Sequence, residues 1–164
     1  IGGSNIISGS VVELPDSRLM LVLSHSNTAP QNKLISYSSD GGGTWSTPSA
    51  IPQGISTLTY GHMYSGIMLK DPAGKLYLVN PVGREKDPQV YNGPNYGVTP
   101  TIFESSDGGA SFTQTGPLFN KITYRGYAVP VGNMDAVFGT DGKMIVVTEG
   151  GVESPQEGIV IYKR

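Results

Sequence analysis

The sequence of 164 residues contains no cysteine, which excludes disulfide bonds and thiolate metal sites. Charged residues make up 15% of it and the formal net charge is -2, so it lacks the basic footprint of a nucleic-acid-binding protein. No apolar run approaches the ~20 residues that a membrane-spanning helix needs. No stretch keeps helical periodicity over the ~11 residues that would identify an amphipathic helix.

Motifs for metals and cofactors are also missing. The two histidines, His25 and His62, lie too far apart in the sequence to form a metal-binding motif based on spacing. The glycine-rich segment 39–44 lacks the Gly-Lys-Ser/Thr ending of a phosphate-binding loop. The sequence therefore predicts neither a metal nor a cofactor.

Turn-forming residues are abundant, with 23 glycines and 12 prolines, and they separate short clusters of aliphatic and aromatic residues. Such a pattern is typical of many short strands joined by turns and not of a disordered chain. The length suits one compact domain. We expect an all-β fold.

One motif occurs twice. Residues 38–45 read Ser-Ser-Asp-Gly-Gly-Gly-Thr-Trp, and residues 105–112 read Ser-Ser-Asp-Gly-Gly-Ala-Ser-Phe. Each position suits a tight turn, because Asp can accept backbone N–H bonds, Gly can take positive φ and the hydroxyls add local bonds. The final aromatic would anchor the turn by burial. The predicted structural positions are Ser38, Asp40, Gly42, Thr44, Trp45, Ser105, Asp107, Gly109, Ser111 and Phe112.

This motif resembles the Asp-box, or bacterial neuraminidase repeat, which lies between the third and fourth strands of blades in sialidase-like β-propellers. The first copy fits every position and the second is a conservative variant. The resemblance implies about three four-stranded blades, or part of a six-bladed propeller. A single partial domain, 1–164, would then hold blades at about 6–52, 62–118 and 133–164.

The third blade is expected to stop before its own motif. If Tyr162 corresponds to Tyr37, the next motif Asp would follow directly after Arg164. Three blades alone would leave an open edge that favours association. We therefore expect the remaining propeller half or additional copies of the chain to complete the ring.

The ligand is expected at the face opposite the motif turns, where long polar loops lie on a rigid scaffold. Aromatic rings there can stack on sugars, and polar groups can bind hydroxyls or a sugar carboxylate. The alternative for each residue taken singly is that it is solvated or stabilises a turn. The candidate substrate-binding residues are Tyr60, His62, Arg84, Tyr96, Tyr124 and Arg125.

Two arginines are the sharpest of these candidates. The resemblance implies an arginine cluster that holds the substrate carboxylate, since a guanidinium can bind it in a bidentate manner. Arg84 and Arg125 could contribute, but four arginines in total do not supply a complete triad from this chain. The family's Tyr/Phe-Arg-Ile-Pro element is matched at Tyr124 and Arg125 only, with Gly126 next.

Catalysis in the family uses a tyrosine nucleophile paired with a glutamate, and an aspartate as acid and base. Other glycoside hydrolases use two carboxylates about 5–9.5 Å apart. Asp135, in an expected inner strand from Met134, and Glu149, at the end of the next strand, are the candidate catalytic pair. The alternative is that Asp135 caps a turn and Glu149 is solvated.

The resemblance implies part of an exo-acting glycoside hydrolase of sialidase type with a glycan ligand. Two alternatives remain open: a non-catalytic propeller that binds glycans or proteins, such as an adhesin or receptor-binding module, and a small unit that assembles from several copies. An extracellular or secreted location is implied, with the periplasm or cell surface as alternatives. No nucleic-acid partner and no membrane span are expected.

Overall fold

A computed structural model describes residues 6–25, 33–51, 66–84, 97–117, 123–124, 127–128, 131–150 and 158–163. Regular structure in these ranges consists of β-strands, and every strand pair is antiparallel. The predicted all-β class is thus confirmed. Across the same ranges, there is no helix with the length and apolar character needed to span a membrane.

The first sheet has four strands in sequence order. These are β1 (Ile6–Glu13), β2 (Leu19–His25), β3 (Lys33–Ser38) and β4 (Ser49–Ala50). Alternation along β2 buries Met20 and Val22 completely on one face, as the aliphatic run 19–23 predicts for a central strand. The fourth strand is shorter than the segment 46–51 expected from sequence, because only Leu34 and Ile35 find partners in it.

The second sheet repeats this order with longer central strands. It contains β5 (Ile67–Lys70), β6 (Leu76–Arg84), β7 (Gly97–Ser105) and β8 (Thr113–Pro117). The sequence predicts a loop from Pro81 to Pro100, whereas both ends of this segment continue the β6–β7 ladder as far as Arg84 and Gly97. Valine and threonine at 82, 98 and 99 favour extended backbone, which explains the longer ladder.

The third sheet has three strands in the described ranges. They are β11 (Val131–Phe138), β12 (Met144–Gly150) and β13 (Gly158–Lys163). Strand β11 begins three residues earlier than predicted and contains a bulge between Val131 and Met134. A separate short hairpin pairs β9 (Thr123–Tyr124) with β10 (Tyr127–Ala128), in a segment where the sequence predicts no strand.

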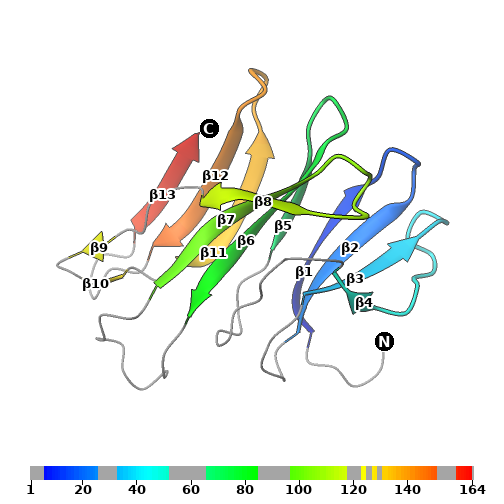
Figure 1. The fold of residues 1–164 in the computed structure, drawn as a ribbon, viewed down its shortest axis with the longest axis horizontal. Helices are drawn as coiled ribbons and strands as arrows, with labels where there is room; N and C mark the ends of the chain where they lie inside the picture. Colours follow the sequence, from blue (N-terminus) through cyan, green and yellow to red (C-terminus); the bar gives the residue numbers. More distant parts are fainter. Residues whose placement is uncertain are drawn as a thin grey trace.

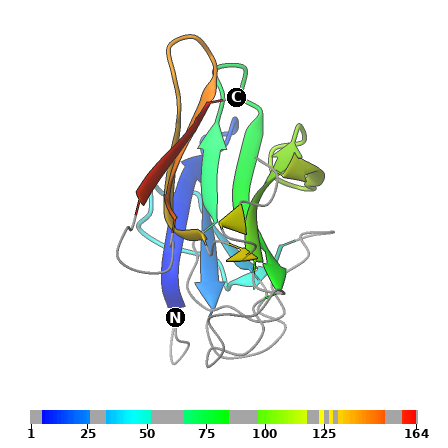
Figure 2. The ribbon, with the colours of Figure 1, turned by 90° about the vertical axis from the view of Figure 1, so that its left-hand side faces the viewer.

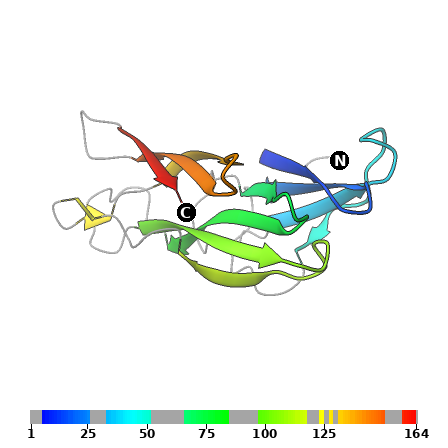
Figure 3. The same ribbon diagram turned by 90° about the horizontal axis from the view of Figure 1, so that it is seen from above.

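The three sheets stack in sequence order through their first strands. Strand β1 packs on β5, and β5 packs on β11, so these inner strands run side by side in one direction (Figures 1 and 2). Seen from above, the three sheets form successive layers (Figure 3). Two apolar clusters fill the spaces between them. The first is centred on Met20, Leu76 and Phe103, and the second on Val79, Ile102 and Val146.

The first hairpin of every sheet closes with the same turn. In each turn the backbone N–H of the first residue (Leu14, Asp71 or Gly139) donates to the carbonyl four residues later. The fourth residue of each turn has positive φ, at 66° in Ser17, 88° in Gly74 and 74° in Gly142. The three turns lie at one end of the sheets (Figure 1), which fixes a common register for the whole stack.

Among the residues other than glycine that the structure describes, Ser17 has positive φ. Because the left-handed conformation costs a side-chain-bearing residue about 1–2 kcal/mol, replacing Ser17 by glycine should stabilise the protein by up to about 1 kcal/mol. The urea midpoint of unfolding would rise. Ser39→Gly is the matched control, because Ser39 is exposed without positive φ and should gain nothing. A lower midpoint for Ser17→Gly would contradict the argument.

Candidate functional site

The repeated motif forms a closed hydrogen-bonded turn between β3 and β4. One oxygen of Asp40 accepts the Thr44 N–H at 2.8 Å and the Ser38 hydroxyl at 2.7 Å. The other oxygen accepts the Thr44 hydroxyl at 2.7 Å. The Gly42 N–H donates to the Ser38 hydroxyl at 2.9 Å. Both carboxylate oxygens of Asp40 and the hydroxyls of Ser38 and Thr44 are therefore used within the turn itself.

The turn between β7 and β8 has the same bonds. Asp107 accepts the Ser111 N–H at 2.9 Å and the Ser105 hydroxyl at 2.7 Å, and its second oxygen accepts the Ser111 hydroxyl. The Gly109 N–H donates to the Ser105 hydroxyl at 2.9 Å. Residues 38–45 and 105–112 thus form the same turn. In each copy both oxygens of the aspartate accept hydrogen bonds within the turn.

The two terminal aromatics differ in burial. Phe112 is 6% exposed and belongs to the cluster between the first and second sheets. Trp45 is half-buried and donates its indole N–H to the Gly42 carbonyl at 3.1 Å. The difference follows from position, because the first sheet lies beside Phe112, whereas no described sheet covers the corresponding face beside Trp45.

Hydrogen bonding to the ionised form lowers the pKa of both motif carboxyl groups. Bonds from Thr44 and Ser38 lower the pKa of Asp40 from 3.8 to about 2, and bonds from Ser111 and Ser105 do the same for Asp107. Since both groups lie at the surface, solvent screens much of this effect. These pKa values indicate turns that need their carboxylates ionised.

Acid should therefore loosen both turns. A folded-state pKa below the unfolded one gives a contribution that is complete above pH 3.8 and is lost as the pH falls toward 2. We expect the melting temperature to fall across this interval. Asp107→Asn should lower it at neutral pH and flatten its decline in acid. An Asp107→Asn protein with the wild-type pH profile would argue against this assignment.

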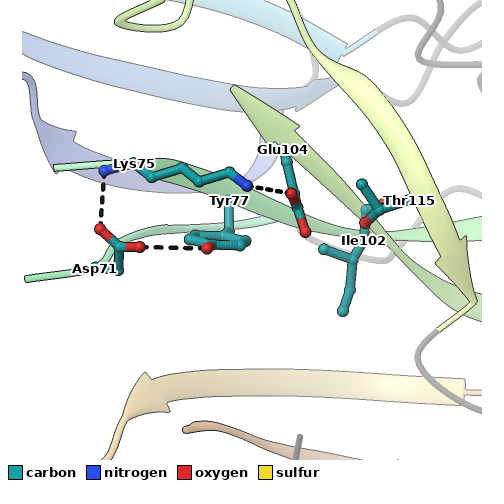
Figure 4. Close-up of polar contacts among 6 residues, drawn as sticks. All are labelled: Asp71, Lys75, Tyr77, Ile102, Glu104 and Thr115. Carbon is teal, nitrogen blue, oxygen red and sulfur yellow. Dashed lines mark hydrogen bonds and ion pairs between the residues drawn. The ribbon is translucent and has the colours of Figure 1, made fainter. Parts of the chain in front are cut away.

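A second polar cluster ties the β5–β6 turn to β7 (Figure 4). Asp71 accepts the backbone N–H of Lys75 at 2.9 Å and the Tyr77 hydroxyl at 3.2 Å. The Lys75 ammonium donates to Glu104, and this bond raises the pKa of Lys75. Burial raises the pKa of the Tyr77 hydroxyl. The cluster combines one Lys75–Glu104 ion pair with an Asp71 carboxylate that accepts hydrogen bonds within the turn, which suits a structural role.

Two depressions adjoin this cluster. One, of about 370 Å³, is lined by Lys75, Glu104 and the hydroxyls of the 105–111 turn and β8. The other, of about 170 Å³, lies between the second and third sheets beside Tyr77 and Phe138. Lys75 and Glu104 form an ion pair, and both oxygens of Asp107 accept hydrogen bonds, so the charged groups that line these depressions are engaged in structural contacts.

The predicted catalytic pair lies in the third sheet. Asp135 is exposed in β11, where it pairs with Val147 of β12. Glu149 stands two residues beyond Val147 and pairs with Ile159 of β13. The described ranges hold no group of three His, Asp or Glu side chains that could bind a metal ion.

The predicted substrate-binding residues are only partly described. Arg84 ends β6, at the end of its sheet opposite the 71–75 turn, and Tyr124 pairs with Tyr127 in the β9–β10 hairpin. Glu149 likewise lies near the end of β12 that is remote from the 139–143 turn. Arg84 and Glu149 thus share the end of the stack that was predicted to bind ligand. Four candidates lie outside the described residues: Tyr60, His62, Tyr96 and Arg125.

One contact between sheets was not anticipated from sequence. The hydroxyl of Ser10, in β1, accepts the backbone N–H of Met68, in β5, at 2.9 Å. In the sequence, a basic residue directly follows the serine or glycine at the fourth position of each hairpin turn; these residues are Arg18, Lys75 and Lys143. Aligning the three hairpins on this basic residue gives Ser10 a defined position in its strand.

No protein-family model matches the sequence, and a search of curated proteins also found no match. Solved structures do match. A protein of unknown function from Dyadobacter fermentans superposes with a TM-score of 0.65 at 16% identity, covering 98% of this chain and 48% of the other.

Two of the similar structures carry named activities. An α-L-arabinanase from Penicillium chrysogenum, complexed with arabinobiose, gives a TM-score of 0.62 at 18% identity, covering 88% of this chain and 41% of the other. An intramolecular trans-sialidase from Ruminococcus gnavus, complexed with oseltamivir carboxylate, gives 0.57 at 19%, covering 90% and 29%.

The chain spans less than half the length of each of these three structures. At such identities the likeness establishes the fold alone. It confirms the predicted sialidase-like β-propeller class, with stacked antiparallel sheets as the repeating unit.

Proposed function

We propose that this chain is part of a carbohydrate-active propeller, an exo-acting glycoside hydrolase of sialidase type. The fold supports the proposal, because similar structures include an arabinanase bound to arabinobiose and a trans-sialidase bound to oseltamivir carboxylate. We further propose that residues 38–45 and 105–112 are Asp-box repeats with a purely structural role, and that the protein acts outside the cell.

The observation that carries the proposal is the register of the third sheet. Asp135 pairs with Val147, and Glu149 stands two residues further along β12. Diagonal neighbours of this kind across an antiparallel pair lie about 7–8 Å apart. Two carboxylates that flank a glycosidic bond need about 5–9.5 Å between them. The sheet thus supports Asp135 and Glu149 as an acid and base pair for glycoside cleavage.

The remaining candidates would bind the sugar. Arg84 lies toward the same end of the stack as Glu149, where a guanidinium could hold a sugar carboxylate. Arg125 would add a second cation, while Tyr60, His62, Tyr96 and Tyr124 would supply stacking and hydroxyl contacts. Such an acidic sugar is the substrate class that distinguishes sialidase chemistry.

The direct test asks whether the complete assembly hydrolyses a fluorogenic sialoside, with an aryl α-L-arabinofuranoside assayed in parallel. Release of the fluorophore from the sialoside would support the sialidase assignment. Cleavage of the arabinofuranoside alone would favour a second candidate, an arabinan-degrading enzyme, which the arabinanase likeness suggests. Binding on a glycan array without turnover of either substrate would contradict hydrolysis and favour the non-catalytic propeller.

A further inference from the structure

The three sheets can be compared position by position. Their first hairpins share one turn and one register, in which Val11 pairs with Leu21, Met68 with Leu78, and Ala136 with Val146. A residue of β1 therefore has a defined counterpart in β5 and in β11. Ser10 corresponds to Ile67 and Asp135, and Val12 corresponds to Leu69 and Val137.

The contact between the first and second sheets shows how neighbouring sheets join. Val12, on the face of the first sheet that meets the second, is 8% exposed. Met68, on the facing side of the second sheet, is 4% exposed. Beside them the Ser10 hydroxyl accepts the Met68 N–H at 2.9 Å. Apolar packing and one hydrogen bond between inner strands thus make this junction.

The outer faces of the stack carry the same positions, and among the described residues no other sheet lies beside them. Val137, the counterpart of Val12, is 57% exposed on the third sheet. Val11, the counterpart of Met68, is 52% exposed on the first sheet. Around them lie half-buried aliphatic side chains, namely Ile145 and Val147 on the third sheet and Leu19 and Leu21 on the first. These two faces therefore carry the counterparts of the two sides of the junction between the first and second sheets.

The glycines of the two motif turns also differ in whether a described neighbouring sheet lies beside them. A Cβ atom on Gly109 would lie 3.0 Å from the sulfur of Met20, in the preceding sheet, and 3.5 Å from Leu76 in its own sheet. On its counterpart Gly42, a Cβ would meet Leu19 and Trp45 of the first sheet at 3.7 and 3.8 Å. Ile145 is the counterpart of Met20 in the third sheet and would supply the missing neighbour.

We propose that the outer face of the third sheet binds the outer face of the first sheet in a second copy of this chain. Val137, Ile145 and Val147 pack against the partner's Val11, the partner's Leu19 and the partner's Trp45. Since each copy carries both halves, two copies close on themselves and bring six sheets together, within the about four to eight blades of closed propellers.

Sedimentation velocity of the 164-residue chain tests the proposal. The wild type should sediment as a dimer at micromolar concentration, and Val11→Lys or Val137→Lys should each weaken the dimer on the order of 100-fold or more, because the ammonium loses its water. Gln114→Lys adds the same charge at an exposed position of β8 and should leave the dimer intact. A monomeric wild type, or a dimer that survives both lysine variants, would overturn the proposal.

Mixing the two lysine variants distinguishes this head-to-tail contact from a symmetric one. Each mixed pair retains one wild-type junction, so dimers should reappear in the mixture although neither variant forms them alone. Circular dichroism checks that both variants are folded. A mixture that stays monomeric would refute the pairing of the two faces.

Discussion

Replacing Asp135 by asparagine, or Glu149 by glutamine, is expected to lower kcat on a cleaved glycoside by about 100-fold or more. Positioned acids and bases contribute about 10²–10⁴-fold to such reactions, and each of these amides keeps the shape while removing the titrating group. KM should change far less, because binding would rest on Arg84 and the aromatic candidates. Steady-state kinetics of the complete assembly measures both constants.

The matched control is Asp141→Asn, which alters an exposed carboxyl of the same sheet at the opposite end of β11. Its kcat should match that of the wild type. If Asp135→Asn and Glu149→Gln also retained wild-type turnover, the carboxylate pair would have no part in catalysis.

Phe103→Ala is expected to destabilise the protein by about 3–5 kcal/mol. The ring is completely buried in the cluster between the first and second sheets. Its removal would leave a cavity lined by side chains from both sheets, which cannot collapse without moving one of them. Because a domain has only about 5–15 kcal/mol of stability, this loss should be visible as a large fall in the denaturant midpoint.

Phe138→Ala provides the comparison. That ring is half-buried and packs edge-on against Tyr77, with centroids 5.2 Å apart, so its removal should cost clearly less. Equal losses for both variants would mean that burial between the first two sheets is not what makes Phe103 important. The two variants thus measure how strongly adjacent sheets depend on each other.

Local chemistry made the turns predictable. The spacing of Ser, Asp and Gly in residues 38–45 and 105–112 requires only bonds within each turn, and the structure forms those bonds in both copies. Strand ends were less predictable, since Pro81–Arg84 continues β6 by pairing with residues 97–100, and the sequence alone did not reveal that partner.

The candidate site depended on the register between strands. The sequence identified Asp135 and Glu149 as polar residues near strand ends, but their relation rests on the pairing of Asp135 with Val147. The bulge that lengthens β11 toward Val131 leaves no clear trace in the sequence. Ser10 gave no signal either, because its only distinguishing feature is the Met68 N–H that reaches it from another sheet.

The sequence by itself determined the all-β class, the two motif turns and the approximate position of the central strands, because alternation and turn chemistry act over a few neighbouring residues. Tertiary structure decided which faces are covered. Val12 and Val137 are identical residues at equivalent positions, yet one is 8% and the other 57% exposed. The physical reason is that burial depends on whether another sheet lies alongside, and no local pattern encodes that.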